Sequence, residues 1–106
     1  MKITRKTIMA SASDYDREPN RYDDRYIVEG YYYKNFSGLA HSMSTNDWSE
    51  ACDAVHAFVS DGDYVEFTDN VTGKSIRTDY DSYFESFDET GEFPFDVTDL
   101  DPNYFD

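Results

Sequence analysis

One stretch of sequence decides the fold: residues 47–60, DWSEACDAVHAFVS. Its apolar side chains recur every three or four residues, which places them on one face of a helix. They are Trp48, Ala51, Cys52, Val55, Phe58 and Val59. Thr45, Asn46 or Asp47 is suited to cap the first turn, and Asp47 and Glu50 have the spacing of a capping box. Gly62 follows closely enough to end the helix. The stretch therefore predicts an amphipathic helix whose apolar face is buried against a sheet.

Four β-strands are expected around this helix. Residues 2–12 and 25–34 precede it and residues 64–68 and 75–78 follow it, all with β-branched or aromatic side chains between turn formers. Gly30 is expected to introduce a bulge into the second of these strands. The sequence thus favours two strands on each side of the helix.

The remaining segments are expected to connect or flank these elements. Residues 14–24, with a central Pro-Asn pair, and residues 35–45, rich in serine, have no apolar period and are interpreted as connections. Aromatic residues at positions 80, 83, 84 and 87 predict a short amphipathic helix over residues 80–89. The predicted order is β-β-α-β-β followed by a short α.

This order predicts an α+β fold. Its main features are a four-stranded, mainly antiparallel sheet and one principal helix packed on one face. The 106 residues are enough for a single domain, which we place at residues 1–98, with an acidic C-terminal tail at residues 99–106. Ten tyrosines and eight phenylalanines supply the burial that the few aliphatic residues do not.

The composition excludes several classes of partner and site. The net charge of −14 has the wrong sign for direct binding to nucleic acid or to an anionic membrane surface. The single cysteine, Cys52, cannot form an intramolecular disulfide, and no apolar run resembles a signal peptide or membrane span. We therefore expect a cytoplasmic protein.

The sequence predicts neither a metal site nor a catalytic site. Cys52 and His56 lie four residues apart in the predicted helix, and we interpret them as a small core residue and a helix-edge residue. The aspartate runs do not match a calcium loop, and no phosphate loop, serine elbow or zinc signature occurs. We expect no enzyme activity and no cofactor.

Charge is distributed unevenly along the chain. Residues 1–50 carry 7 basic and 8 acidic side chains, whereas residues 51–106 carry 2 and 15. On a strand, carboxylates at i and i+2 lie roughly 6.6 Å apart, close to twice the roughly 3.4 Å axial spacing of phosphates along one DNA strand. The C-terminal acids can therefore imitate a nucleic-acid backbone, with aromatic residues as anchors. The predicted partner-binding residues are Asp79, Tyr80, Asp81, Tyr83, Glu85, Asp88, Glu89, Glu92, Asp96, Asp99 and Asp101.

In size, charge and the aromatic-acid alternation YDSYFESFDE of residues 80–89, the chain resembles small acidic phage-encoded inhibitors of bacterial defence. These are the anti-CRISPR proteins and the anti-restriction DNA mimics. The resemblance implies a stoichiometric inhibitor that occupies the basic DNA-binding groove of a CRISPR effector nuclease or a restriction enzyme. It also implies action in the cytoplasm of an infected bacterial host.

Two alternatives stand beside this interpretation. In the first, the protein is a non-catalytic interaction module that binds its partner through the aromatic strand around Tyr31, Tyr32 and Tyr33, and the acids only solubilise it. In the second, the acidic composition is a halophilic adaptation, in which case folding itself requires high salt. Binding that weakens steeply with salt favours mimicry over an aromatic interface.

Overall fold

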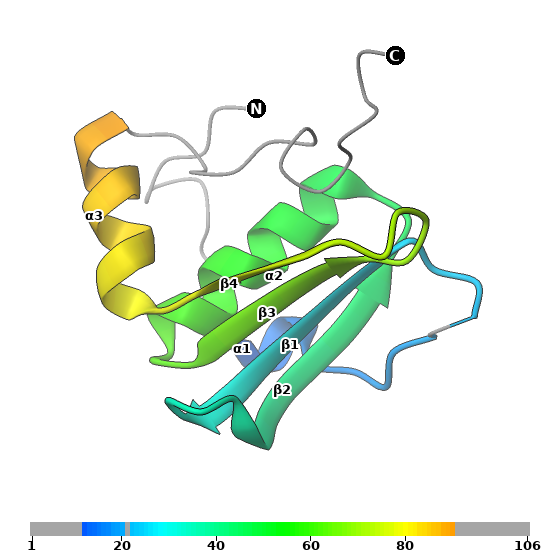
Figure 1. The fold of residues 1–106 in the computed structure, drawn as a ribbon, viewed down its shortest axis with the longest axis horizontal. Helices are drawn as coiled ribbons and strands as arrows, with labels where there is room; N and C mark the ends of the chain where they lie inside the picture. The colour runs from blue at the N-terminus through cyan, green and yellow to red at the C-terminus, as the bar shows by residue number, and fades with distance from the viewer. Residues whose placement is uncertain (1–11, 21, 91–106) are drawn as a thin grey trace.

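Four antiparallel strands form one sheet in the order β2-β1-β3-β4 (Figure 1). The computed structural model describes residues 12–20 and 22–90. The strands are β1 (Tyr26–Tyr33), β2 (Ser37–Thr45), β3 (Tyr64–Asp69) and β4 (Ser75–Thr78). The helices are α1 (Ala12–Tyr15), α2 (Trp48–Ser60) and α3 (Tyr80–Thr90). The predicted α+β class and antiparallel sheet are confirmed.

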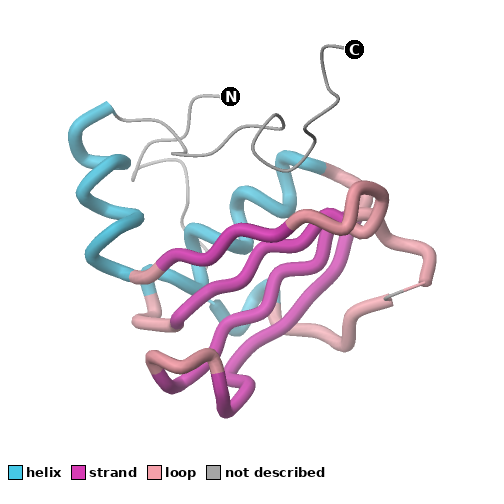
Figure 2. The backbone as a smooth tube through the Cα atoms, viewed as in Figure 1, coloured by secondary structure: helices cyan, strands magenta, loops and turns pink. Residues whose placement is uncertain are grey.

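Helix α2 packs against one face of the sheet, as the view of the backbone shows (Figure 2). Val55 and Phe58 are fully buried, as predicted, among the strand side chains of the core. Trp48 is only half-buried, because it is the first residue of α2 and its ring covers the margin of the core. Its ring centroid lies 5.3 Å from that of Tyr26 and 5.4 Å from that of Phe67.

The ends of α2 follow the predicted caps. Asp47 is the N-cap, and its carboxylate accepts a hydrogen bond from the Ser49 backbone N–H at 2.9 Å. The capping box with Glu50 does not form, because the Asp47 backbone N–H donates to the Thr45 hydroxyl at 3.0 Å, while the Glu50 carboxylate accepts from Arg17 at 2.7 Å. Gly62, with a φ of 92°, provides the left-handed backbone that ends the helix and turns the chain toward β3.

Residues 37–45 form strand β2, which corrects the prediction of a connection over residues 35–45. The segment SGLAHSMST has few of the side chains that favour strands, so its extended conformation depends on pairing with β1. The register of that pair shifts between Gly30 and Tyr31, where β2 carries one extra residue, Ala40, so the bulge lies opposite Gly30, on β2 and not on the strand for which it was predicted. With β2 on one side and β3 on the other, β1 is an inner strand of the sheet.

The chain before β1 covers part of the outer edge of β2. The backbone N–H of Arg17 donates to the Ser42 carbonyl at 2.7 Å, and the Ser42 N–H donates to the Asp16 carboxylate at 2.9 Å. The Arg17 guanidinium also donates to the Ser44 carbonyl at 2.7 Å. Residues 16–17 thus satisfy polar backbone groups that an edge strand would otherwise expose.

Some predictions fall wholly or partly outside the described residues. Of the predicted strand over residues 2–12, the structure describes only Ala12, which begins α1 rather than ending a strand. The predicted loop over residues 14–24 begins inside α1. The predicted tail at residues 99–106 lies outside the described residues, as do residues 1–11 and 91–98 of the predicted domain. The division into domain and tail therefore stays a prediction.

Candidate functional site

Helix α3 carries the predicted acidic surface and is held to α2 by its aromatic side. Asp79 precedes the helix, and its carboxylate accepts from the Ser82 backbone N–H at 2.9 Å, as an N-cap does. Tyr83, Phe84 and Phe87 are buried on the side facing the core. The predicted helix over residues 80–89 is therefore confirmed, with its aromatic face inward.

A buried histidine joins α3 to α2. His56 is only 4% exposed, which corrects its interpretation as a helix-edge residue, and its Nδ1 lies 2.8 Å from the Tyr83 hydroxyl oxygen. The rings of Tyr83, Phe84 and Phe87 have centroids between 4.8 and 5.4 Å from that of His56. Burial also raises the pKa of Tyr83 above its ordinary value, so the phenol stays neutral. This contact fixes the orientation of α3.

The opposite side of α3 forms a surface that we call the α3 acidic face. It consists of Asp81, Glu85, Asp88 and Glu89, all of which are exposed. Helix α3 contains no basic residue. Because these residues lie on a helix, the strand spacing of roughly 6.6 Å does not apply to them. Residues four apart rise about 6 Å along the axis, which still gives an array close to twice the phosphate spacing.

The other predicted partner-binding residues differ in their environment. Tyr80 is 51% exposed at the start of α3, where its ring packs against Phe84 with centroids 4.8 Å apart, whereas Tyr83 is fully buried. We therefore assign Tyr83 to the core and leave it out of the proposed surface. Asp79 is half-buried at the start of the helix, where it acts as a cap. Glu92, Asp96, Asp99 and Asp101 lie outside the described residues.

Three arginines form ion pairs with carboxylates outside α3. Their N–O distances are between 2.7 and 2.9 Å. The pairs are Arg17–Glu50, Arg25–Asp69 and Arg77–Glu66. These pairs place cationic charge on the sheet and beside the start of α2.

Aromatic side chains are exposed at the end of the β1–β2 hairpin. Tyr32 and Tyr33 are 66% and 64% exposed, and Leu39 is 51% exposed. The two tyrosine rings lie edge-on to each other, with centroids 6.5 Å apart. We call this group the aromatic hairpin tip. Tyr31, in contrast, is half-buried and packs against Phe36 in the turn.

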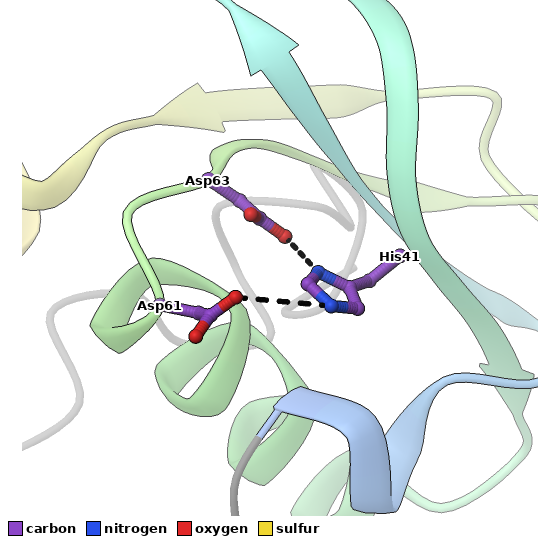
Figure 3. A group of neighbouring side chains, drawn as sticks. All are labelled: His41, Asp61 and Asp63. Carbon is purple, nitrogen blue, oxygen red and sulfur yellow. Dashed lines mark hydrogen bonds and ion pairs between the residues drawn. The ribbon is translucent and has the colours of Figure 1, made fainter.

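A second polar cluster lies where α2 ends beside β2 (Figure 3). His41, on β2, directs its Nδ1 to an Asp63 carboxylate oxygen at 2.6 Å and its Nε2 to an Asp61 carboxylate oxygen at 3.8 Å. Its ring stacks on Phe58, with centroids 5.3 Å apart and an interplanar angle of 23°. These residues were not predicted, because no spacing signal relates a histidine on one strand to a turn 20 residues later.

Burial raises the pKa of two ionisable side chains, one in α2 and one in the turn that follows it. Burial raises the pKa of Asp63 above its ordinary value, and the hydrogen bond from His41 partly opposes that change. Burial likewise raises the pKa of the Cys52 thiol, which is fully buried in α2. A neutral buried thiol is a poor nucleophile and metal ligand, in agreement with the interpretation of Cys52 as a core residue.

Comparison of the chain with protein-family models, with curated proteins and with solved structures found no match. Within residues 12–20 and 22–90, no helix combines the length and the apolar character needed to cross a membrane.

Proposed function

We propose that this protein inhibits a nucleic-acid-binding bacterial defence enzyme, in the first place a CRISPR effector nuclease, by occupying its basic DNA-binding groove. The α3 acidic face is the observation that carries this proposal. Its four carboxylates are exposed on one helix, and the opposite side of that helix is anchored by buried aromatic rings. Three of them, Asp81, Glu85 and Glu89, recur every four residues, so the helix presents negative charge at a regular interval on a rigid support.

Rigidity matters because an array of like charges repels itself. On a mobile segment, carboxylates move apart and lose their spacing, and binding must then restore it at an entropic cost. Here the Tyr83–His56 hydrogen bond and the packing of Phe84 and Phe87 fix the helix before any partner arrives. Tyr80, half-exposed at the start of the same helix and packed against Phe84, offers an aromatic contact that strengthens a charged interface.

The end of α3 gives a further electrostatic reason for a cationic partner. Asp88 and Glu89 lie in its last turns, where the helix dipole disfavours negative charge, and the last turn has no basic residue. This arrangement lowers the stability of the helix itself. Lysine and arginine side chains from a partner's groove reduce that repulsion, so part of the binding free energy comes from α3.

Neutralising the α3 acidic face is expected to weaken inhibition at least about tenfold, which corresponds to about 1.4 kcal/mol. The variant is Asp81→Asn, Glu85→Gln, Asp88→Asn, Glu89→Gln, with Asp79 unchanged because it caps the helix. The measurement is the concentration that displaces labelled duplex DNA from a guide-loaded CRISPR effector nuclease, with a restriction enzyme as a second target. Circular dichroism establishes that each variant is folded.

A matched pair of double variants separates position from net charge. Asp81→Asn with Glu85→Gln removes two charges four residues apart from α3, and Asp14→Asn with Glu18→Gln removes two equally spaced, exposed charges elsewhere. Only the first pair is expected to reduce inhibition, and raising the salt concentration is expected to weaken the parent complex steeply. Equal inhibition by all folded variants, or no displacement of DNA by the parent, contradicts the proposal.

The exposed aromatic hairpin tip supports a second candidate function, that of a non-catalytic protein-interaction module. In that case Tyr32→Ser with Tyr33→Ser abolishes capture of the partner, and the complex tolerates salt. The same double variant leaves inhibition by the α3 acidic face unchanged if the first proposal is correct.

A further inference from the structure

The ligand atoms of His41, Asp61 and Asp63 lie within 4.8 Å of one another, close enough to share a metal ion. We propose that His41 Nε2 and an Asp61 carboxylate oxygen bind a divalent transition-metal ion, with Zn²⁺ as the best match, while Asp63 positions the imidazole. The proposal is independent of the proposed inhibitory function, because the site uses no residue of the α3 acidic face.

Asp63 sets the state of the imidazole. Its side chain is 5% exposed, and its oxygen lies 2.6 Å from His41 Nδ1. When Nδ1–H donates to this carboxylate, the neutral imidazole carries its lone pair on Nε2. A carboxylate that holds the far nitrogen of a histidine is the usual support of a metal-binding imidazole, since it fixes the tautomer and raises the basicity of the ligand nitrogen.

The distance between Nε2 and Asp61 suits an ion better than a direct contact. The two atoms are 3.8 Å apart, which is too far for a hydrogen bond. A zinc ion makes bonds of about 2.0–2.2 Å to nitrogen and to carboxylate oxygen, so a bent N–Zn–O unit spans this gap. Figure 3 shows Asp61 and Asp63 on the same side of the ring, each directed at a different nitrogen.

The end of helix α2 adds a second attraction for a cation. Asp61 is the C-cap, and the backbone N–H groups of residues 61–63 donate to carbonyls of the last turn. The aligned peptide dipoles place partial negative charge at this end, and the last turn of α2 has no basic residue. A divalent ion at Asp61 therefore interacts favourably with the helix as well as with its ligands.

The surrounding backbone holds these side chains in place before an ion binds. Gly30, paired with His41 across the sheet, has no β-carbon, and one placed there would collide with the Asp63 carboxylate. The β1–β2 bulge begins at the same position. Phe58 stacks against the imidazole and restricts its rotation. Such restriction lowers the ordering cost of binding.

The ligand types select the class of ion. One imidazole nitrogen and one carboxylate oxygen suit Zn²⁺ and neighbouring transition ions, whereas Mg²⁺ and Ca²⁺ favour sites made of oxygen alone. The His41 side chain is 17% exposed and that of Asp61 57%, so solvent reaches the ion. Water molecules therefore complete the coordination of the bound ion.

The test is a titration of the whole chain with Zn²⁺, followed by calorimetry and by NMR of the imidazole nitrogens. The expected result is one ion per chain and a large shift of His41 Nε2, with His56 as an internal reference because it is buried beside α3. Asp61→Asn is expected to weaken binding at least about tenfold. Asp63→Asn, which keeps an acceptor for Nδ1–H, is expected to weaken it by about 10–100-fold.

Two controls make the outcome decisive. Asp81→Asn removes an exposed aspartate from α3 and is expected to leave the Zn²⁺ affinity unchanged. His41→Gln removes the nitrogen ligand and is expected to abolish Zn²⁺ binding. If His41→Gln does not fold, Asp61→Asn still tests the site, because Asp61 is on the surface and its substitution leaves the core intact. Absence of Zn²⁺ binding, or binding that Asp61→Asn and Asp81→Asn weaken equally, overturns the proposal and leaves the cluster as an ion pair only.

Discussion

Replacing Phe58 by alanine is expected to lower the free energy of unfolding by about 3–5 kcal/mol, the range found for truncating a buried aromatic side chain. Phe58 is fully buried in α2 and also supports the imidazole of His41. Its removal leaves a cavity that the helix and sheet can close only by moving closer together, which disturbs the remaining core. Urea denaturation followed by far-ultraviolet circular dichroism measures the loss.

Two further variants serve as controls for the loss of stability in Phe58→Ala. Tyr33→Ala removes an aromatic ring that is 64% exposed, so its effect should stay within about 0.5 kcal/mol. Trp48→Ala removes a half-buried ring at the start of α2 and should cost less than Phe58→Ala. A loss below about 1 kcal/mol for Phe58→Ala would show that α2 does not pack on the sheet in this way.

Substituting Gly30 with alanine is expected to destabilise the protein by about 1–3 kcal/mol, as extra atoms in a packed interior do. The added methyl group would occupy the position of the Asp63 carboxylate, which is itself held by His41. Either the side chain leaves its place, with loss of the His41 contact, or β1 shifts away from the turn before β3. The same denaturation measurement reports the cost.

A double-mutant cycle identifies the cause of that cost. In the background Asp63→Ala the obstructing carboxylate is absent, so Gly30→Ala should cost clearly less than it does in the parent. Equal costs in the two backgrounds would show that the glycine is required for another reason, such as the conformation of the bulge. The cycle therefore measures the contact between β1 and the turn directly.

Local patterns predicted the elements whose sequence signals agree with their environment. The apolar period of residues 47–60 located α2 almost to the residue, and the turn formers before Ser75 located β4. The aromatic spacing from Tyr80 likewise predicted α3. In each case, one face of the element is buried against the core, so the sequence pattern and the packing carry the same information.

Tertiary contacts determine what the sequence did not reveal. Strand β2 is extended because β1 and residues 16–17 pair with its two edges, although its own side chains favour strands weakly. His56 becomes a core residue only because Tyr83 arrives from α3 to bind it. His41 contacts Asp63 because β2 lies beside the turn that precedes β3. The spacing of residues along the sequence cannot predict such a contact.

The covering of β2 by residues 16–17 limits how copies of this protein can assemble. An endless cross-β polymer requires every molecule to offer two open sheet edges, one for each neighbour. Here both backbone groups of Ser42, on the β2 edge of the sheet, are already hydrogen-bonded to residues 16–17. At this position a strand from a second copy cannot pair with β2, which hinders the growth of such a polymer through this edge.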